Sequence, residues 1–334
     1  MNLREVAKIA GVSPATASYA LSGKGRLSSE TRQRVFSVAD RFGYRPQGAG
    51  RALATGRREV IGMVSVRGLT HTWAASLEAG LVDYLEGRAY HLLVFHAEPR
   101  QAKLPAMALR RMVDGLAVLL DWHGSFLAEL VRNGIPAVAA APDRDRCEID
   151  SVRTDDDEGV KTATRHLLDR GHRRIAFFAG GGSPSVPQTQ LRRWRAYVTA
   201  MSERSFPTYP GGDRFGMEPE EALSQLFLAR PPGAFGSPTA LVCCSDTDAW
   251  SAVQWLAKQG LGVPGDVSVV GFDNEDHARW STPALTTIDP GFGRIGEETG
   301  RLLLERIDEP GLPVREITVS AKLVIRESTR NVGG

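Results

Sequence analysis

Residues 3–21 read LREVAKIAGVSPATASYAL, and this stretch decides the fold of the amino-terminal part of the chain. Apolar residues at Val6, Ile9 and Ala10 recur at helical spacing, and apolar positions resume after a Gly-Val-Ser segment. Gly11 can supply the positive φ of a tight turn, and the next serine can accept hydrogen bonds from the first N–H groups of a second helix. The pattern therefore predicts a helix-turn-helix.

The second of these helices would have a core face and an outer face. Ala17 and Leu21 lie at core spacing, which leaves the opposite side free to enter a major groove. The residues on that side are Pro14, Ala15, Ser18 and Tyr19. Because a helical hairpin that serves only packing shows a similar pattern, the motif by itself leaves packing and DNA binding open.

The distribution of charge favours DNA binding. Residues 1–58 hold 11 Lys and Arg against 3 Asp and Glu, whereas the other 276 residues hold 30 against 36. A basic segment attached to a body of opposite net charge is the electrostatic footprint of a module that binds a polyanion.

Length and composition place the chain among proteins of the cytoplasm. Its 334 residues exceed one ordinary core and indicate two or three domains. We expect no signal peptide and no membrane span, because no long apolar run occurs at the start or elsewhere. Cys147, Cys243 and Cys244 show no C-x-x-C spacing, and the adjacent pair is expected as buried thiols in a strand.

A third helix over 29–42 completes a headpiece at residues 1–46. Residues 47–58 read QGAGRALATGRR, a linker in which the first two glycines each cost a helix about 1 kcal/mol relative to Ala. We expect this segment to be loose in the free protein and to order on DNA, where its arginines meet phosphates. A plain flexible linker is the alternative.

From Val60 the pattern changes to alternating strands and helices, beginning with a buried strand over 60–66, a helix over 77–87 and a strand over 91–95. This rhythm predicts parallel sheets covered by helices, in two lobes with a ligand cleft at the carboxyl ends of the strands. Further helices are expected over 107–113, 126–133, 159–170, 191–202, 219–229 and 249–259, and further strands over 115–120, 137–141, 174–179, 241–244 and 268–272.

Several of these stretches, in the same order, resemble the LacI/GalR family of bacterial repressors. They are the headpiece, the linker with its Arg-Ala-Leu, and residues 61–64, 159–180, 193–197 and 263–288. The resemblance implies an all-α helix-turn-helix headpiece, a hinge helix over 47–58 and an α/β two-lobed effector domain of the type I periplasmic-binding-protein kind. That effector-binding and dimerisation domain would occupy 59–334, with lobes at about 59–158 plus 289–317 and 159–288 plus 318–330.

The family reads bases with the first, second and sixth residues of its recognition helix, here Pro14, Ala15 and Tyr19. Pro14 lacks an N–H and Ala15 lacks a polar atom, so neither can read a base by a hydrogen bond. We therefore expect the Tyr19 phenol and the Thr16 and Ser18 hydroxyls to make the polar contacts, the two hydroxyls with phosphate.

Weak readout by the headpiece would give the hinge more weight. Leu53 matches the leucine that the family wedges into a minor-groove step, and a packing role within the linker is its alternative. Arg51 is expected to contact DNA beside it.

The resemblance also implies effector-binding residues. Arg193 and Asp273 match the family's ligand-binding arginine and aspartate, which suit the hydroxyls of a sugar. Trp73 and Trp280 fall at cleft positions from which a flat ring can stack on a sugar. A surface arginine, a helix-capping aspartate and core tryptophans are the alternatives.

The first lobe departs from the family pattern. The usual D-x-S-N-P-F-F is RGLTHTW at 67–73, and the usual V-D-R is AAP at 140–142. We expect the polar set of this lobe to be rebuilt around Asp121 and Trp122. For this reason the effector's identity does not transfer from any relative.

Other chemistries find little support. The triple glycine at 180–182 lacks a phosphate-loop pattern, and the acidic run 155–158 lacks EF-hand spacing and suits the start of the following helix. None of the seven histidines lies at the spacing of a metal site, and we expect no cofactor. An assignment as an enzyme would rest on the α/β fold alone.

The sequence therefore predicts a cytoplasmic, sequence-specific repressor of a catabolic or transport operon. It would bind palindromic operator DNA as a homodimer, without a tetramer-forming heptad tail, and would respond to a sugar or sugar derivative. The alternative is a cytoplasmic solute-binding protein or α/β enzyme with an incidental basic N-terminus.

Overall fold

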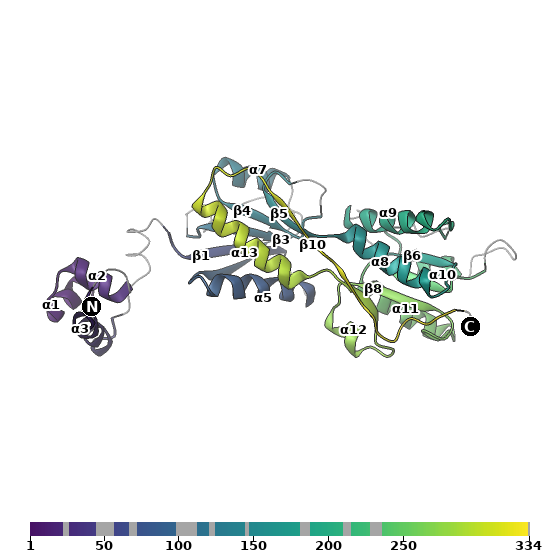
Figure 1. Ribbon diagram of the computed structural model, residues 1–334, viewed down its shortest axis with the longest axis horizontal. Coiled ribbons are helices and arrows are strands. Elements are labelled where there is room, and N and C mark those ends of the chain that lie inside the picture. The colour runs from purple at the N-terminus through teal and green to yellow at the C-terminus, as the bar shows by residue number, and fades with distance from the viewer. Residues whose placement is uncertain are drawn as a thin grey trace. The chain divides into compact units, whose positions relative to one another are not determined.

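The computed structural model divides the chain into two compact units, Met1–Glu59 and Val60–Gly334 (Figure 1). The predicted hinge residues Arg51 and Leu53 lie outside the described residues, as does most of the predicted helix over 107–113, whose last two residues are not helical. The structure describes residues 1–22, 27–44, 57–66, 72–97, 112–119, 124–143, 147–180, 188–209, 215–227 and 236–332.

The first unit contains the three predicted helices, α1 (Leu3–Ala10), α2 (Pro14–Ser22) and α3 (Ser29–Arg41). Asn2 and Glu5 form a capping box at the start of α1. Asn2 Oδ1 accepts a hydrogen bond from the Glu5 N–H at 3.0 Å, and the Glu5 carboxylate accepts one from the Asn2 N–H at 2.9 Å. This reciprocal cap satisfies two backbone donors that the helix leaves unpaired.

The turn between α1 and α2 has the predicted chemistry. Gly11 has a φ of +65°, which glycine adopts without strain, and Ser13 Oγ accepts a hydrogen bond from the Thr16 N–H at 3.0 Å. Ile9, which the helical spacing placed with the core, is 51% exposed because the buried stripe of α1 runs through its neighbours. The core of the bundle consists of Val6, Ala7, Ala10, Ala17, Ala20, Val35 and Ala39.

The first lobe is built on a sheet of strand order β10-β5-β4-β3-β1-β2, in which all neighbours are parallel. Helices α5 (Thr72–Glu86) and α13 (Phe292–Asp308) cover one face, and α7 (Gly124–Arg132) covers the other. The strands are β1 (Val60–Val66), β2 (His91–Ala97), β3 (Gly115–Leu119), β4 (Ala137–Ala140), β5 (Asp150–Thr154) and β10 (Glu316–Val319).

Helices α5 and α13 cross with their backbones in contact. A Cβ atom on Gly80 would meet the Gly293 carbonyl, and one on Gly296 would meet the Leu77 carbonyl. Helix α5 also begins five residues before the predicted range 77–87.

The second lobe is built on a sheet of order β11-β9-β8-β7-β6, in which only β11 is antiparallel to its neighbour. Helices α8 (Asp156–Asp169) and α9 (Gln188–Glu203) cover one face, and α10 (Pro219–Phe227) and α11 (Asp246–Lys258) cover the other. The remaining elements are β6 (Ile175–Phe178), β7 (Ala240–Cys243), β8 (Ser268–Phe272), α12 (Asp276–Trp280), β9 (Thr286–Asp289) and β11 (Lys322–Val324).

The chain passes between the lobes three times, after β5, after β9 and after β10. Hydrogen bonds join the three crossings to one another. Thr154 Oγ1 donates to the Pro290 carbonyl at 3.0 Å, and the Asp155 N–H donates to the Val319 carbonyl at 2.9 Å. A movement of one lobe against the other therefore acts on all three segments together.

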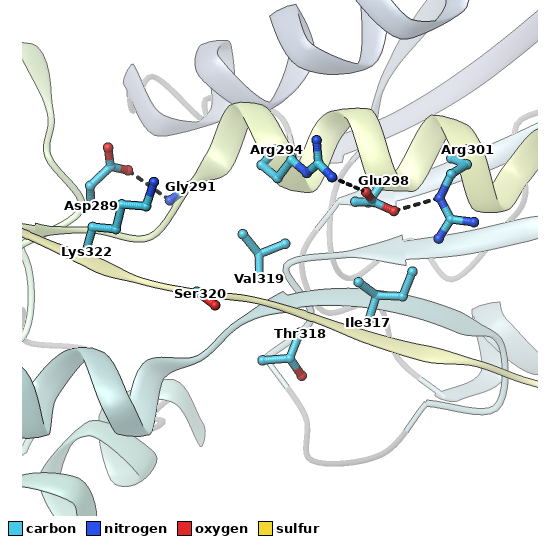
Figure 2. A pocket seen from close by; sticks show the side chains of 10 residues that line it. All are labelled: Asp289, Gly291, Arg294, Glu298, Arg301, Ile317, Thr318, Val319, Ser320 and Lys322. Atoms are coloured by element: carbon cyan, nitrogen blue, oxygen red, sulfur yellow. Dashed lines mark hydrogen bonds and ion pairs between the residues drawn. The ribbon is translucent and has the colours of Figure 1, made fainter.

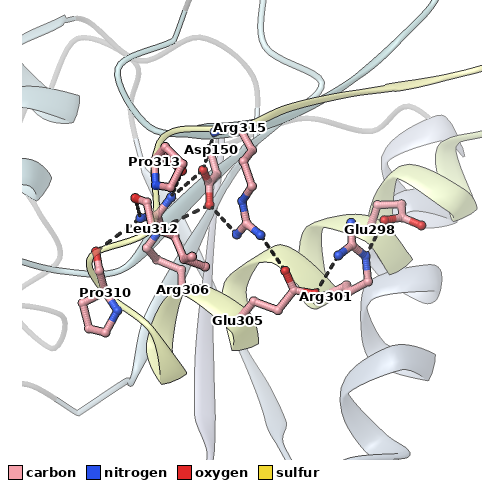
Figure 3. Close-up of polar contacts among 9 residues, drawn as sticks. All are labelled: Asp150, Glu298, Arg301, Glu305, Arg306, Pro310, Leu312, Pro313 and Arg315. Atoms are coloured by element: carbon pink, nitrogen blue, oxygen red, sulfur yellow. Dashed lines mark hydrogen bonds and ion pairs between the residues drawn. The ribbon is translucent and has the colours of Figure 1, made fainter.

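A buried ion-pair network ties α13 to the first sheet (Figure 3). Asp150, 1% exposed, accepts hydrogen bonds from Arg306 Nη2 at 2.7 Å and from the backbone and side chain of Arg315 at 2.8 and 3.1 Å. Arg315 continues to Glu305 at 2.6 Å, and Glu305 to Arg301 at 2.6 Å. Burial alone would raise the pKa of Asp150, but the hydrogen bonds from the two arginines hold it below its ordinary value.

The acidic run at 155–158 is part of a helix. Helix α8 begins at Asp156 and not at the predicted Gly159, because Asp155 Oδ1 accepts a hydrogen bond from the Glu158 N–H at 3.0 Å and caps it. Cys243 and Cys244 are buried, as predicted, and burial raises the pKa of both thiols. No helix in the described part of the chain is long and apolar enough to span a bilayer.

Candidate DNA interface and effector cleft

Helix α2 exposes the residues that the sequence assigns to a major groove, while Ala17 and Ala20 are fully buried beneath them. Tyr19 is 53% exposed. Thr16 Oγ1 lies 2.8 Å from Ser13 Oγ, so its predicted phosphate contact would compete with this pairing at the start of the helix. The exposed positions are Pro14, Ala15, Ser18 and Tyr19.

A cleft of about 180 Å³ lies between the two lobes, where segments that follow the carboxyl ends of strands meet. The lining residues are Trp73, Ala141, Pro142, Arg153, Thr154, Asp156, Thr189, Arg192, Arg193, Asp273 and Phe292.

Arg193 lines the cleft from α9 in the second lobe and is 8% exposed. Its Nε donates to Asp156 Oδ1 at 2.9 Å, and its Nη1 donates to the Cys244 carbonyl at 2.5 Å. The guanidinium carbon lies 3.6 Å from the centre of the Phe272 ring. These contacts hold the planar cation in one orientation, which is what a directional ligand contact requires.

Asp273 reaches the same site from the turn after β8. Its carboxylate lies 3.7 Å from Arg193 Nη1, beyond hydrogen-bond distance. Burial raises the pKa of Asp273 well above its ordinary value, against the opposing effect of Arg193. Asp273 and Asn274 have φ values of +113° and +51°, a conformation that is strained for side chains with a Cβ and that often marks functional sites.

Asp143 joins the two lobes at the cleft. It follows β4 in the first lobe, and its carboxylate accepts hydrogen bonds from the Gln188 and Thr189 N–H groups at 3.1 and 2.6 Å. The Thr189 hydroxyl donates to it at 2.5 Å. Asp143 is therefore the amino-terminal cap of α9 in the opposite lobe, where its charge also favours the helix dipole.

Of the two tryptophans predicted at the cleft, only one lines it. Trp73 lines the cleft, with its ring centre 4.9 Å from that of Phe292. Trp280 does not line it: the side chain lies on α12 and is 78% exposed. The short helix after β8 directs Trp280 to solvent, so the stacking role assigned to it is not supported by its position. Asp121 and Trp122 lie outside the described residues.

Sequence reasoning missed several residues of the cleft. Asp156 was grouped with the acidic run, yet it binds Arg193 and lies 3.4 Å from Arg192 Nη2. Arg192 was next to an identified residue and could have been included on that ground. Arg153 carried no local signal, because only the sheet brings it to the cleft. The same holds for Asp143, which does not line the cleft but binds Thr189, a residue that does.

A second hollow, of about 600 Å³, lies against α13, β10 and β11 (Figure 2). Its charged side chains largely pair with one another: Glu298 lies 2.9 Å from Arg294 and 2.7 Å from Arg301. Asp289 accepts a hydrogen bond from the Gly291 N–H at 2.8 Å. The interlobe cleft, with its aromatic wall and convergent polar groups, is the better candidate for an effector site. The described residues contain no cluster of potential metal ligands.

A helix-turn-helix unit joined to a two-lobed domain with a ligand cleft defines a DNA-binding regulator under ligand control. Residues 2–47 match the bacterial regulatory proteins of the lacI family, and residues 164–329 match the periplasmic binding protein-like domain. The chain belongs to the LacI family of bacterial regulators, and it is a transcriptional repressor that binds DNA and a small-molecule effector.

Similar proteins agree over the whole chain. The HTH-type transcriptional repressor PurR of Pasteurella multocida is 28% identical over 337 residues, and the ribose operon repressor of Haemophilus influenzae is 29% identical over 334, with 98% of each chain covered in both cases. The solved complex of the transcriptional regulator CelR with cellobiose matches with a TM-score of 0.68 at 25% identity, covering 98% of this chain and 99% of that one.

Proposed function

We propose that this repressor acts in the cytoplasm as a homodimer on a palindromic operator of a catabolic or transport operon, under the control of a sugar or sugar derivative. The observation that carries the sugar assignment is the convergence of Arg193, Asp273 and Trp73 in the interlobe cleft. Directional polar groups suit hydroxyls and a flat ring suits the face of a sugar. The cellobiose complex of a similar regulator supports the same ligand class.

Control would act through the arrangement of the lobes. An effector that binds one arrangement better shifts the population toward it, and the coupling between effector and DNA is reciprocal. A ligand that separates the two hinges of the dimer would release DNA and act as an inducer. One that holds them together would act as a corepressor.

The ligand is tested by thermal unfolding of the full chain with a panel of sugars and sugar derivatives. A ligand at 100 times its Kd adds about 2.7 kcal/mol of stability, which raises the melting temperature by several degrees. Arg193→Gln should abolish the response, whereas Arg204→Gln, at a half-exposed position outside the cleft, should preserve it. A panel that leaves the melting temperature unchanged would contradict the sugar assignment.

The DNA site is tested by selecting bound sequences from a random duplex library with the full chain. We expect a site with two-fold symmetry, and binding that weakens steeply with salt. Tyr19→Ala should relax base preference in each half-site, and Leu53→Ala should weaken binding to the selected site. If the Leu53 variant binds the selected site with unchanged affinity, Leu53 does not wedge into the minor groove. If the selected site lacks two-fold symmetry, the operator is not a palindrome.

In the proposed dimer, Trp280 would lie in the interface between the two chains. Its side chain is 78% exposed, and α12 contacts α11, which carries the 49% exposed Trp250; a second copy of the chain would bury Trp280. Trp280→Ala should move the monomer–dimer equilibrium toward monomer in sedimentation experiments, with Trp73→Ala as a control that leaves it unchanged. A stable tetramer, or a dimer insensitive to both changes, would contradict this assignment.

A further inference from the structure

The turn after β8 is anchored by the side chain of Asn274, the residue that follows Asp273. Asn274 Nδ2 donates a hydrogen bond to Asp289 Oδ2 at 3.2 Å, and Asn274 Oδ1 accepts one from Arg326 Nη2 at 2.6 Å. The amide therefore bridges a carboxylate and a guanidinium, which determines the partner that each end of it faces. Asp289 ends β9 and Arg326 follows β11, so the bridge ties the turn to two neighbouring strands.

This bridge holds a backbone that is not relaxed by itself. Asp273 and Asn274 have φ values of +113° and +51°. Asparagine enters the left-handed region more readily than most residues, but such a conformation persists only where its surroundings fix it. The Asp273 N–H donates to the Ile288 carbonyl at 2.9 Å, and the side chain of Asn274 supplies the next attachment. The position of the Asp273 carboxylate in the cleft therefore depends on Asn274.

The same bridge reaches the aromatic wall of the cleft in the first lobe. Asp289 Oδ1 accepts a hydrogen bond from the Gly291 N–H at 2.8 Å, at the second crossing between the lobes (Figure 2). Gly291 has a φ of +74° and precedes Phe292, the first residue of α13, which lines the cleft. The Phe292 ring centre lies 4.9 Å from that of Trp73. One carboxylate thus connects Asn274 to the start of α13.

We propose that Asn274 is a positioning residue of the effector site. Through Asp289 it fixes the Asp273 carboxylate of the second lobe relative to the Phe292 ring of the first. Asn274 is not one of the described residues that line the cleft, so it acts through these neighbours and not on the effector directly. An effector that moves Asp273 would then act on the crossing at 289–291. This inference rests on the proposed sugar control and deepens it.

Removing the bridge while keeping the backbone tests the role of the side chain. Glycine adopts positive φ without strain, so Asn274→Gly loses only the side-chain contacts. The full chain is titrated calorimetrically with whichever of glucose, galactose, ribose and cellobiose most raises the melting temperature of the wild type. We expect the variant to bind that sugar about fivefold more weakly. Its melting temperature without sugar should change by no more than about 4 °C.

A matched control and a contrary outcome belong to this titration. Asn133→Ala removes a side-chain hydrogen bond to the Glu129 carbonyl at an exposed position of α7, and it should bind as the wild type does. If Asn274→Gly also binds as the wild type does, Asn274 serves only the left-handed backbone, and the proposal is overturned.

Exchanging the two partners tests the contact itself. Asn274→Asp places a second carboxylate beside Asp289 and should weaken sugar binding about tenfold. Adding Asp289→Asn restores an amide–carboxylate pair, and the new amide oxygen can still accept from the Gly291 N–H. We expect the double variant to return to within about threefold of the wild-type affinity. A rescue of the melting temperature without a rescue of affinity would assign Asn274 to stability alone and overturn the proposal.

Hydrogen exchange of the full chain without sugar tests the link to the crossing independently of the ligand. In Asn274→Gly the amides of residues 289–295 should exchange about tenfold faster, while those of α7 keep the wild-type rate. Wild-type exchange at 289–295 would overturn the link to the crossing. If all four sugars leave the wild-type melting temperature unchanged, the sugar function fails, and exchange at 289–295 still decides whether Asn274 holds the crossing.

Discussion

Two buried aspartates meet arginines in this molecule, with opposite results. Asp150 in the first lobe accepts hydrogen bonds from Arg306 and Arg315 at 2.7–3.2 Å, and its pKa is lowered (Figure 3). Asp273 at the cleft lies 3.7 Å from Arg193, and its pKa is raised. Burial raises the pKa of both groups. At Asp150 the hydrogen bonds from the two arginines outweigh it, whereas at Asp273 burial is the largest effect and the neighbouring carboxylates of Asp246, Glu275 and Asp156 add to it against Arg193.

This difference in pairing distinguishes a carboxylate that holds the fold together, Asp150, from one that we assign to the effector site, Asp273. The Asp150 carboxylate is satisfied by groups of its own lobe, which fixes α13 against β5 and β10 and leaves nothing for a ligand. Asp273 is held by a strained turn in front of an arginine that it does not fully engage. A buried group that the fold leaves incompletely paired is free to pair with something else.

The largest effect is expected from breaking the scaffold pair. Asp150→Asn leaves the buried Arg306 charge without its partner, which should lower the free energy of unfolding by about 3–5 kcal/mol. Urea unfolding of the full chain measures it. Asp273→Asn should change the unfolding free energy by less than about 1 kcal/mol, and equal losses in the two variants would erase the distinction.

Low pH should destabilise the fold through the same pairing of Asp150 with its arginines. Because the folded-state pKa of Asp150 is lowered, its contribution to stability is present above the ordinary aspartate pKa and is lost as the pH falls below it. In wild type the unfolding free energy should therefore fall below about pH 4 more steeply than in Asp150→Asn. Parallel pH profiles for the two proteins would contradict the role given to this carboxylate.

The next effect belongs to the site. Asp273→Asn should weaken binding of whichever panel sugar stabilises the wild type, by about 1.5–3 kcal/mol, since hydrogen bonds to charged groups contribute that much. Calorimetric titration measures the loss. Asp150→Asn, assayed where it remains folded, should keep the wild-type affinity. If Asp150→Asn weakened sugar binding more than Asp273→Asn, the ligand would bind outside the interlobe cleft.

A smaller effect is expected where the lobes meet. Asp143→Ala removes the cap of α9 and should cost about 1 kcal/mol of the closed arrangement, which weakens effector binding about fivefold. Asp143→Asn, which can still cap, should restore most of it. An increase in the radius of gyration of the alanine variant alone, measured by small-angle scattering, would support an opened cleft. Equal affinities for all three proteins would show that this contact does not control closure.

The smallest effect is expected at the outer end of the network in Figure 3. Glu298→Gln breaks pairs with Arg294 and Arg301 (Figure 2), whose side chains are 62% and 37% exposed. Solvent screens such pairs, so the unfolding free energy should fall by no more than about 1 kcal/mol. A loss as large as that of Asp150→Asn would mean that the whole network, and not its buried end, holds α13.

Prediction from sequence succeeded where local chemistry decides the structure. The helix-turn-helix followed from helical spacing, Gly11 and Ser13, and the two α/β lobes followed from the alternation after Val60. It was less exact at helix starts: α8 begins at its acidic cap, and the spacing in α1 could not show that Ile9 faces out. Arg193, Asp273 and Trp73 were placed together through the family resemblance, whereas Trp280 was misplaced because a short helix sets its direction.

The sequence by itself determined the class of protein, because caps, turns, periodicity and charge are properties of neighbouring residues. Only the tertiary structure decided which buried charges are paired. Asp150 and Arg306 are 156 positions apart, and Asp143 caps a helix that begins 45 residues later in the other lobe. Such pairings depend on how sheets and lobes come together in space, and no local pattern records them.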